Sequence, residues 1–417
     1  MSAAERTTAV ASGVERVARE SYGRLLAHLA AAWRDVAAAE DALAGAFEAA
    51  LKYWPERGAP DNPTAWLAAV ARRNLLDQLR RRRVAARSED QVIRQLEDLA
   101  ASDGEAEEIP DRRLALMFVC AHPAIDANIR APLMMQTVLG IDAARIASAF
   151  LVAPATMGQR LARAKAKIRD AAIPFAIPDA QDWPDRIGWV LEAIYGAFAI
   201  AHDEAFADDP FGRGLAQEAI WLARVVVFLN ADEPEGLGLL ALLLFIQARR
   251  DARRDALGRY APLSEQDTTN WDAALIDEAE ALLLRAAQRH APGRFQLEAA
   301  IQSAHCIRRR GVPVAWPAIA MLYERLGDFV PSRVVEIHRA MAIANAGKLS
   351  EGLARLAAVE ADGDLEQFQP FWAAKAELCA RAGRKDGATA AYDRAIGLER
   401  DPSVREFLLA KRAEAAR

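Results

Sequence analysis

The residues best placed to do chemistry in this sequence are cations. Four consecutive arginines end an amphipathic segment that begins near Asn62, namely Arg80, Arg81, Arg82 and Arg83. One or two cations would complement the dipole at a helix C-terminus, so a run of four indicates contact with phosphate groups. The alternative interpretation is a solvated helix face, with Trp66 lying against a neighbouring helix.

A second cationic group recurs at helical spacing after Pro154. Four apolar residues are spaced as one buried stripe: Met157, Leu161, Ala164 and Ile168. The opposite face is predicted to be polar and basic, with Thr156, Gln159, Arg160, Arg163 and Lys167 in the exposed stripe and Lys165 and Arg169 beside it. Arginine and glutamine can pair with guanine and adenine edges, and lysine can hold phosphate. This face therefore predicts DNA binding.

No residues with the spacing of a catalytic or metal site accompany these cations. The six histidines lack a cysteine or carboxylate at ligand spacing, and the pair Cys120 and His122 is only a weak metal hint. The three cysteines show no CxxC pattern, which favours a reduced, cytoplasmic setting. We expect no catalytic residue, no metal, no cofactor and no enzymatic activity of the chain by itself.

Composition indicates a helical protein with localised charge. The 417 residues are 53% apolar and 27% charged, and runs that favour strands are scarce. The fold class predicted is therefore all-α. The net charge of -5 conceals an asymmetry, because residues 1–175 carry +2 and residues 176–417 carry -7. No signal peptide is expected, and the longest apolar run, residues 236–248, is too short to span a bilayer.

The first predicted domain, residues 12–84, is a bundle of helices. One helix has apolar residues at near-helical spacing, Val36, Leu43, Phe47 and Leu51, and residues 55–63 break it with three prolines and a glycine. The next helix, capped by Asn62 or Thr64, directs one arc to a core: Leu67, Val70, Ala71, Leu75 and Leu79. Trp66, Arg73, Asp77 and Arg80 share another arc.

Residues 85–110 are acidic, poor in aromatic residues, and predicted to be a flexible linker. Residues 111–173 form the next helical domain. Within it, a helix over residues 142–150 directs Ile146 and Phe150 inward, and a short turn leads to Pro154, which suits the first turn of a helix. Helix, turn and helix with a basic outer face predict a helix-turn-helix. The alternative is an αα-hairpin with a solvated face.

The last domain, residues 183–417, is predicted to be a series of short helices with an internal period. Gly311, Gly347 and Gly383 are 36 residues apart, and each stands between two apolar helical stretches. The final unit resembles a tetratricopeptide repeat (TPR) at Gly383, Ala388, Tyr392, Ala395 and Pro402. The other two units match less well, so the domain is described as TPR-like; an irregular helical domain is the alternative.

The combined motifs resemble the sigma factors of bacterial RNA polymerase, in the extracytoplasmic-function (ECF) class of the sigma-70 family. The stretch "AAAEDALAGAFEAALKYW" is similar to the helix that docks on the polymerase clamp, with matches at Glu40, Asp41 and Phe47. "NPTAWLAAVARRNLLDQLRRRR" is similar to the segment that reads and melts the -10 element, and "ATMGQRLARAKAKIR" resembles the -35 recognition helix. One ECF subgroup also carries a long TPR-like extension.

This resemblance implies a region-two domain, a linker and a region-four helix-turn-helix, with core RNA polymerase and promoter DNA as partners. It implies that the acidic linker threads through positively charged polymerase channels. It implies contacts with the -10 element from Trp66, Arg72, Arg73, Asn74, Asp77, Arg80, Arg81, Arg82 and Arg83. It implies contacts with the -35 element from Thr156, Gln159, Arg160, Arg163, Lys165 and Lys167. A flipped -10 base would lie against residues 56–62, where Trp66 is a stacking candidate and a core role is the alternative.

The sequence also departs from the family pattern. Ala44 and Gly45 replace a usual Gln-Glu pair in the docking helix, and Gly158 and Gln159 replace the more usual Lys and Ser in the recognition helix. The resemblance implies that the extension modulates activity, through a protein or intramolecular partner. Two alternatives remain: a helical scaffold whose extension binds a protein while the N-terminal part only tethers it to DNA, and a repressor or activator that uses the helix-turn-helix without polymerase.

Overall fold

The structure is a computed structural model that describes residues 3–83, 109, 111–150, 152–179, 182–204, 210–361 and 365–417. These residues form α-helices and short 3-10 turns, and the β-structure among them is a lone bridge between Arg254 and Tyr260. The all-α fold class is therefore confirmed. The linker predicted over residues 85–110 lies outside the described residues, apart from residue 109. The chain divides into two compact units, residues 1–225 and 226–417.

The first unit begins with three helices that pack on one another. Their bounds are α1 (Ala3–Trp33), α2 (Val36–Arg57) and α3 (Pro63–Arg83). The side chain of Asp35 accepts a hydrogen bond from the Ala38 backbone N–H at 3.1 Å, which caps the start of α2. The small residues of α2 and α3, such as Ala39, Ala42 and Ala71, are fully buried and let the helices approach closely.

The end of α2 differs from the sequence prediction. The helix continues through Pro55 and stops at Gly58, whose φ of 83° only glycine adopts readily. The prediction that the break begins at Pro55 is wrong, because a proline near the helix end removes only one backbone hydrogen bond. Leu51, part of the predicted apolar spacing, is 48% exposed, whereas Val36 and Leu43 are fully buried.

The next helices of the first unit are shorter. They are α5 (Arg113–Cys120), α6 (Ala127–Thr137), α7 (Ala143–Ala149) and α8 (Pro154–Asp170). Asp126 caps α6, and Asp142 caps α7 by accepting hydrogen bonds from the backbone N–H groups of Ala144 and Arg145 at 3.0 and 2.9 Å. Pro154 is the first residue of α8, and Ala153 before it provides no side-chain cap, as predicted.

Two long helices follow in the chain, α9 (Pro184–Glu204) and α10 (Pro210–Leu229). Although the sequence places α9 in the extension, it packs on α5 and α6. The ring of Trp183, just before α9, lies 4.8 Å from that of Phe118. The side chain of Met135 occupies the space that a Cβ at Gly196 would need. The boundary between the two compact units therefore lies after residue 225, and not between the predicted domains 111–173 and 183–417.

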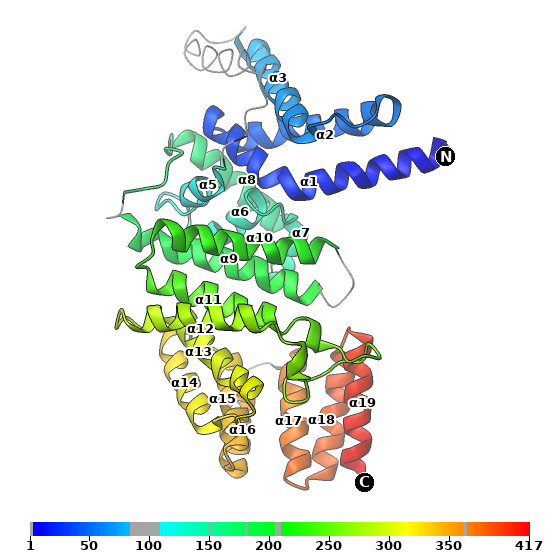
Figure 1. Ribbon diagram of the computed structural model, residues 1–417, viewed down its shortest axis with the longest axis vertical. Helices are drawn as coiled ribbons and strands as arrows, with labels where there is room; N and C mark the ends of the chain where they lie inside the picture. The colour runs from blue at the N-terminus through cyan, green and yellow to red at the C-terminus, as the bar shows by residue number, and fades with distance from the viewer. Residues whose placement is uncertain are drawn as a thin grey trace. The chain divides into compact units, whose positions relative to one another are not determined.

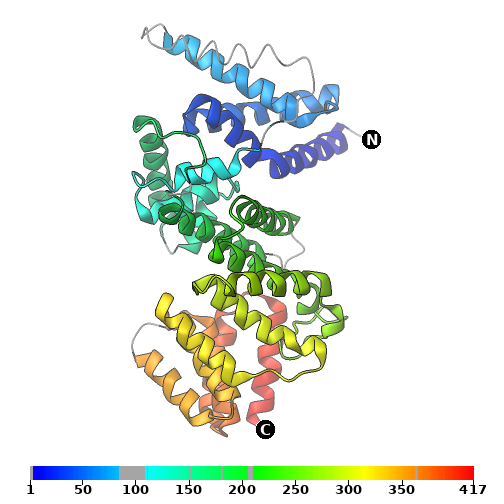
Figure 2. The ribbon, with the colours of Figure 1, turned by 60° about the vertical axis from the view of Figure 1, so that its left-hand side comes forward.

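The second unit consists largely of helices that pair in sequence order (Figures 1 and 2). Gly311, Gly347 and Gly383 have left-handed φ values of 70°, 90° and 70°, and each reverses the chain between two helices. The 36-residue spacing therefore marks three inter-helix turns, of which those at Gly347 and Gly383 are alike, whereas Gly311 follows a 3-10 turn and precedes a longer connection to α14. The helices are α11 (Pro234–Ala248), α12 (Ala273–Ala287), α13 (Arg294–Cys306), α14 (Trp316–Phe329), α15 (Arg333–Asn345), α16 (Leu349–Ala361), α17 (Gln369–Arg381), α18 (Lys385–Leu398) and α19 (Pro402–Ala416).

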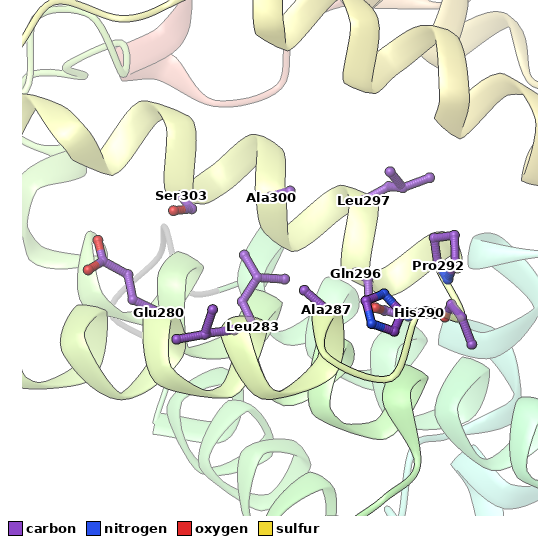
Figure 3. Close-up of a pocket in the computed structure, with 11 residues that line it drawn as sticks. Glu280, Leu283, Ala287, His290, Pro292, Gln296, Leu297, Ala300 and Ser303 are labelled. Carbon is purple, nitrogen blue, oxygen red and sulfur yellow. Dashed lines mark hydrogen bonds between the residues drawn. The ribbon is translucent and has the colours of Figure 1, made fainter.

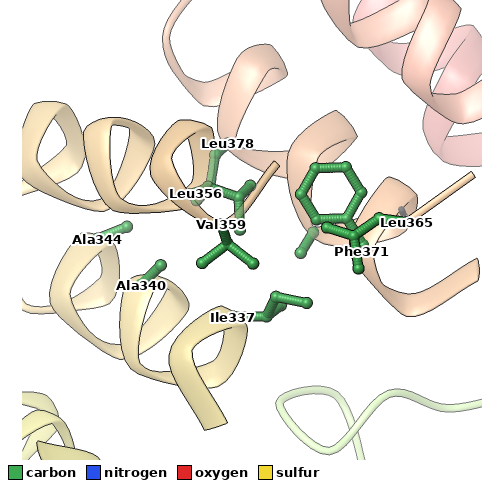
Figure 4. Packing of buried hydrophobic residues seen from close by; sticks show 9 residues of the cluster. Ile337, Ala340, Ala344, Leu356, Val359, Leu365, Phe371 and Leu378 are labelled. Carbon is green, nitrogen blue, oxygen red and sulfur yellow. The ribbon is translucent and has the colours of Figure 1, made fainter. Parts of the chain in front are cut away.

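The core of this unit is built from successive clusters that share helices. Figure 4 shows one cluster, in which Ile337 of α15, Val359 of α16 and Phe371 of α17 lie in a common apolar region. The next cluster joins α17, α18 and α19, and it contains Tyr392 and Leu408. Because each helix pair buries its apolar face on the next, the helices pack as a linear series. No described helix combines the length and the apolar character that a membrane span requires.

Candidate nucleic-acid interface

The predicted core face of α3 is largely confirmed. Leu67, Ala71 and Leu75 are fully buried, whereas Val70 is half-buried. The side chain of Asn62 accepts a hydrogen bond from the Ala65 backbone N–H at 3.0 Å, so Asn62 rather than Thr64 caps the helix. The side chains of Leu79 and of the four terminal arginines lie outside the described residues, although their backbone is helical.

Trp66 packs against a second tryptophan rather than standing free. Its half-buried ring lies 5.5 Å from the ring of Trp54 on α2, at an angle of 63°. Trp54 is buried and precedes the turn between α2 and α3. An edge-to-face pair holds both rings in place. The pair leaves part of Trp66 accessible next to the loop where we expect an unpaired base.

Asn74 occupies a helix contact that sequence reasoning missed. Its side-chain amide donates a hydrogen bond to the backbone carbonyl of Ala42 at 3.1 Å. A Cβ at Gly45 would lie 3.0 Å from the Asn74 Nδ2 atom, so Gly45 leaves the space that this amide fills. The signal in the sequence was the glycine that departs from the family pattern in α2. Asn74 therefore joins α3 to α2, and its amide faces away from any ligand on the outer arc of α3.

Positive charge gathers where α3 passes the end of α1. The pKa of His28 falls to about 4, because of burial first and then the charges of Arg72, Arg112 and Arg24. Arg73 on α3 is exposed, and Asp77 is half-buried. A neutral histidine surrounded by three guanidinium groups marks a region of positive potential, which favours a polyanion.

The buried stripe of α8 is confirmed. Met157, Leu161, Ala164 and Ile168 are all less than a tenth exposed. Of the residues predicted to be exposed, Gln159, Arg160, Arg163 and Lys167 are exposed, and Thr156 is half-buried. In α7, Ile146 is buried as predicted, but Phe150 is 40% exposed. The expectation that Phe150 points inward is wrong, because the chain ends α7 at this residue and leaves the helical direction.

Lys165 is the main departure from the predicted basic face. Its side chain is 9% exposed, and its Nζ atom lies 2.5 Å from the Oε2 atom of Glu40 on α2. The prediction that Lys165 lies beside the exposed stripe is wrong, because α2 packs over that edge of α8. In this arrangement Lys165 is not accessible to DNA. Helical spacing alone gave no sign of a partner that lies 125 residues away in sequence.

The exposed cations of α8 border a hollow of about 460 Å³. Arg160, Arg163 and Lys167 line one wall, and Asp126 and Asn128 at the start of α6 line the other. The Asp126 carboxylate already accepts a hydrogen bond from the Asn128 backbone N–H at 2.8 Å. Cations therefore outnumber acids here, so the hollow suits a phosphate group better than a cation.

The residues matched to polymerase docking lie on α2 in three different environments. Glu40 is 19% exposed and bound to Lys165, Asp41 is exposed, and Phe47 is half-buried. Burial raises the pKa of Glu40, and the charge and hydrogen bond of Lys165 oppose that shift. Only Asp41 of the three is freely accessible in this arrangement.

The second unit contains a larger hollow of different character. A groove of about 680 Å³ runs between α12 and α13, with apolar walls that include Leu283, Leu284 and Leu297 (Figure 3). The two titratable residues that line it, Glu280 and His290, lie at opposite ends. Glu280 is paired with Arg310 at 2.6 Å. The groove therefore brings no acid and base together. Across the described residues, no three potential ligands gather as a metal site.

Comparisons with known proteins assign two parts of the chain. Residues 18–84 match the family model of Sigma-70 region 2, and residues 186–287 match a family of unknown function, DUF6596. An uncharacterized protein of Rhizobium meliloti (strain 1021) is 35% identical over 394 residues, which cover 93% of this chain and 92% of the relative. No solved structure matches.

Proposed function

Since this chain belongs to the sigma-70 family of RNA polymerase sigma factors, we propose that it directs transcription from promoters with its own -35 and -10 elements, as an ECF-class member. Proteins with a Sigma-70 region 2 bind core RNA polymerase and recognise or melt promoter DNA, and they are transcription factors rather than enzymes. The promoter elements, the ECF class and the role of the extension are the parts that we propose.

At the -10 element, we assign recognition to the exposed arc of α3. Trp66 is half-buried and follows residues 56–62 directly in the chain, so its ring is the candidate on which an unpaired base can stack. The cations that hold phosphate groups are Arg72, Arg73 and the four arginines at the end of α3. Asp77 is the one carboxylate among them. Asn74 supports this arc through its bond to Ala42 instead of contacting DNA.

At the -35 element, α8 is the recognition helix of a helix-turn-helix. Gln159, Arg160, Arg163 and Lys167 are exposed on one side of it, with Thr156 half-buried nearby. Arginine and glutamine donate and accept in patterns that distinguish base pairs in the major groove. Lys165 joins this set only if α8 separates from α2.

We assign the extension a regulatory role as a TPR-like array. Three of its inter-helix turns carry a left-handed glycine, and Ala388, Tyr392 and Ala395 are buried in α18. An array of this kind presents a long continuous surface to a protein partner. We place the protein with the polymerase in the cytoplasm.

One observation carries the proposal: a Sigma-70 region 2 shares a compact unit with a helix pair whose second helix exposes a row of base-reading and phosphate-binding side chains. Residues of both predicted promoter-binding surfaces occur in a single chain. A DNA-tethered scaffold would need only one such surface, and a self-contained repressor would not need region two.

Reconstituted transcription tests the proposal. The full chain mixed with core polymerase should start transcripts at defined promoters, and core alone should not. Arg160→Ala should abolish the preference among -35 sequences, whereas Arg325→Ala, the same substitution at an exposed position of α14, should not. Binding to core without start-site choice would support the scaffold. Sequence-specific DNA binding without any effect on core would support the repressor.

A further inference from the structure

The loop between α11 and α12, residues 249–272, lies against the last helix of the second unit. Its segment 254–260 folds back on itself through the bridge between Arg254 and Tyr260, and this segment meets the start of α19 (Figure 1). Tyr260 and Ser403, which are bonded there, are 143 residues apart in sequence. We propose that the loop is a clasp, which covers the end of the helical series and couples its last helix to its first ones. This coupling belongs to the second unit alone and does not depend on the proposed function.

Polar contacts fix the clasp to the N-terminus of α19. The Arg254 guanidinium lies 3.1 Å from the Asp401 carboxylate, and the two side chains are 33% and 19% exposed. The same carboxylate caps α19, since it accepts a hydrogen bond from the Ser403 backbone N–H at 2.8 Å. The Ser403 hydroxyl in turn accepts one from the backbone N–H of Tyr260, also at 2.8 Å. Asp401 and Ser403 therefore begin the helix and hold the loop at the same time.

An aromatic contact continues the clasp along α19. The half-buried rings of Tyr260 and Phe407 lie 5.5 Å apart at an angle of 71°, which is an edge-to-face geometry. Phe407 also packs on the buried cluster that joins α17, α18 and α19. Further along the helix, Lys411 lies 3.7 Å from Glu265 of the loop. The loop therefore follows α19 for about two helical turns.

The other side of the loop is anchored to the early helices of the unit. Arg308, which follows α13 closely, donates hydrogen bonds to the backbone carbonyls of Leu263 and Gln266, the second at 3.2 Å. Its guanidinium also lies 5.5 Å from the ring of Trp271, a buried residue at the end of the loop. The loop is therefore fixed to the segment after α13 on one side and to α19 on the other.

A cover of this kind answers a physical need of the last helix. In a linear series each helix pair buries its apolar face on the next pair, so the final helix has a face that no following helix covers. An open array places polar residues on that face, and its two ends do not affect each other, because each repeat contacts only its neighbours. Here Tyr260 covers part of the face at Phe407. Because the cover comes from the start of the unit, the two ends should lose structure together.

Hydrogen–deuterium exchange of the full chain tests this coupling. Tyr260→Ala should speed exchange in α19 by about fivefold, the factor that corresponds to losing an aromatic pair of ordinary strength. In the reverse direction, Phe407→Ala should speed exchange in the loop segment 254–260. Without a clasp, the effect of Tyr260→Ala would stay in its own loop and the helices next to it in sequence.

Matched variants separate the clasp from a general loss of side-chain contacts. Leu257→Ala removes a side chain that is 76% exposed from the same loop, and Leu409→Ala removes one that is 48% exposed from α19. Neither should change exchange in the opposite partner. Arg254→Gln and Asp401→Asn test the ion pair without removing an aromatic ring, and asparagine can still cap α19. Because both changes remove one contact, the double variant should exchange no faster in α19 than the more affected single variant.

Three results would overturn the proposal. In the first, Tyr260→Ala speeds exchange in its own loop and leaves α19 at the parent rate. In the second, Leu257→Ala affects α19 as much as Tyr260→Ala does. In the third, the effects of Arg254→Gln and Asp401→Asn on α19 are additive, which would show that the two side chains act independently.

Discussion

Asn74 shows that a residue can match a functional motif and yet have a structural role. Its amide bonds the Ala42 carbonyl at 3.1 Å and fills the space left by Gly45. Its neighbour Arg73 points to solvent. The two residues are adjacent in the segment assigned to the -10 element, so helix geometry alone divides them into a packing residue and a ligand-facing residue.

Replacing Asn74 tests this division. Asn74→Ala should lower the free energy of unfolding of the first unit by about 1 kcal/mol, because a half-buried hydrogen bond between α2 and α3 is lost. Arg73→Ala should change stability by less than about 0.5 kcal/mol. Urea unfolding monitored by circular dichroism measures both effects.

In promoter binding the order of the two variants should be reversed, so that Arg73→Ala is the more affected. Arg73→Ala should weaken promoter binding and flatten its salt dependence, since a phosphate contact is removed. Asn74→Ala should bind with parent affinity under conditions where it is folded. An Asn74→Ala protein of parent stability that has lost promoter discrimination would contradict the structural role.

Lys165 marks the limit of sequence reasoning at the residue scale. The four apolar residues of its helix were predicted correctly, because their periodicity is a property of one helix. Lys165 flanks that stripe, and its exposure depends on whether another element covers it. Glu40 comes from α2, 125 residues earlier, and no local pattern records that contact.

At the scale of elements, small residues decide how closely two helices of the second unit cross. A Cβ at Gly352 on α16 would lie 2.7 Å from the backbone oxygen of Ala340 and 2.8 Å from the Cβ of Ala344, both on α15. Ala388 on α18 lies 36 residues after Gly352, and it is fully buried. The period that the turn glycines mark therefore continues inside the helices.

Filling this crossing should destabilise the second unit. Gly352→Ala should cost about 1–3 kcal/mol of unfolding free energy, because the added Cβ must push α15 and α16 apart. Gly397→Ala, on α18 with no atom within 4 Å, is the matched control and should stabilise its helix by up to about 1 kcal/mol. Thermal unfolding measures both, and equal effects of the two changes would refute a close crossing.

The elements themselves were predictable for local reasons. The start of α8 at Pro154, the cap at Asn62 and the turns at the three periodic glycines each depend on residues within a few positions. The end of α2 was misplaced because a proline near a helix terminus does not break it. The packing of α9 on α5 and α6 could not be predicted, because both surfaces are apolar helix faces with several compatible partners.

At the scale of the whole molecule, the extension was predicted to begin at residue 183, whereas the first compact unit continues to residue 225. The helices of the proposed region four bury apolar residues against the segment that the sequence assigns to the extension, as the contacts of Phe118 with Trp183 and of Met135 with Gly196 show. Arg113 at the start of α5 forms an ion pair with Glu218 and lies 4.1 Å from the ring of Trp221. Helices α5 and α6 thus share a core with α9, and Arg113 of α5 also contacts Glu218 and Trp221 of α10.

Two truncations should therefore behave differently. A fragment that ends at residue 175 loses every partner named above for Phe118, Met135 and Arg113, and exposes side chains that are now buried. We expect it to aggregate or to unfold at a lower temperature than a fragment that ends at residue 230, which retains α9 and α10.

Size-exclusion chromatography and thermal unfolding of the two fragments measure this difference, and transcription with core polymerase then shows what the rest of the extension does. Only the longer fragment separates the proposed regulation from folding, because it keeps the packing partners of α5 and α6. If the fragment ending at residue 175 is monomeric and equally stable, α5–α8 do not need α9 and α10 to fold, and a loss of activity on removing them would support the proposed regulatory role.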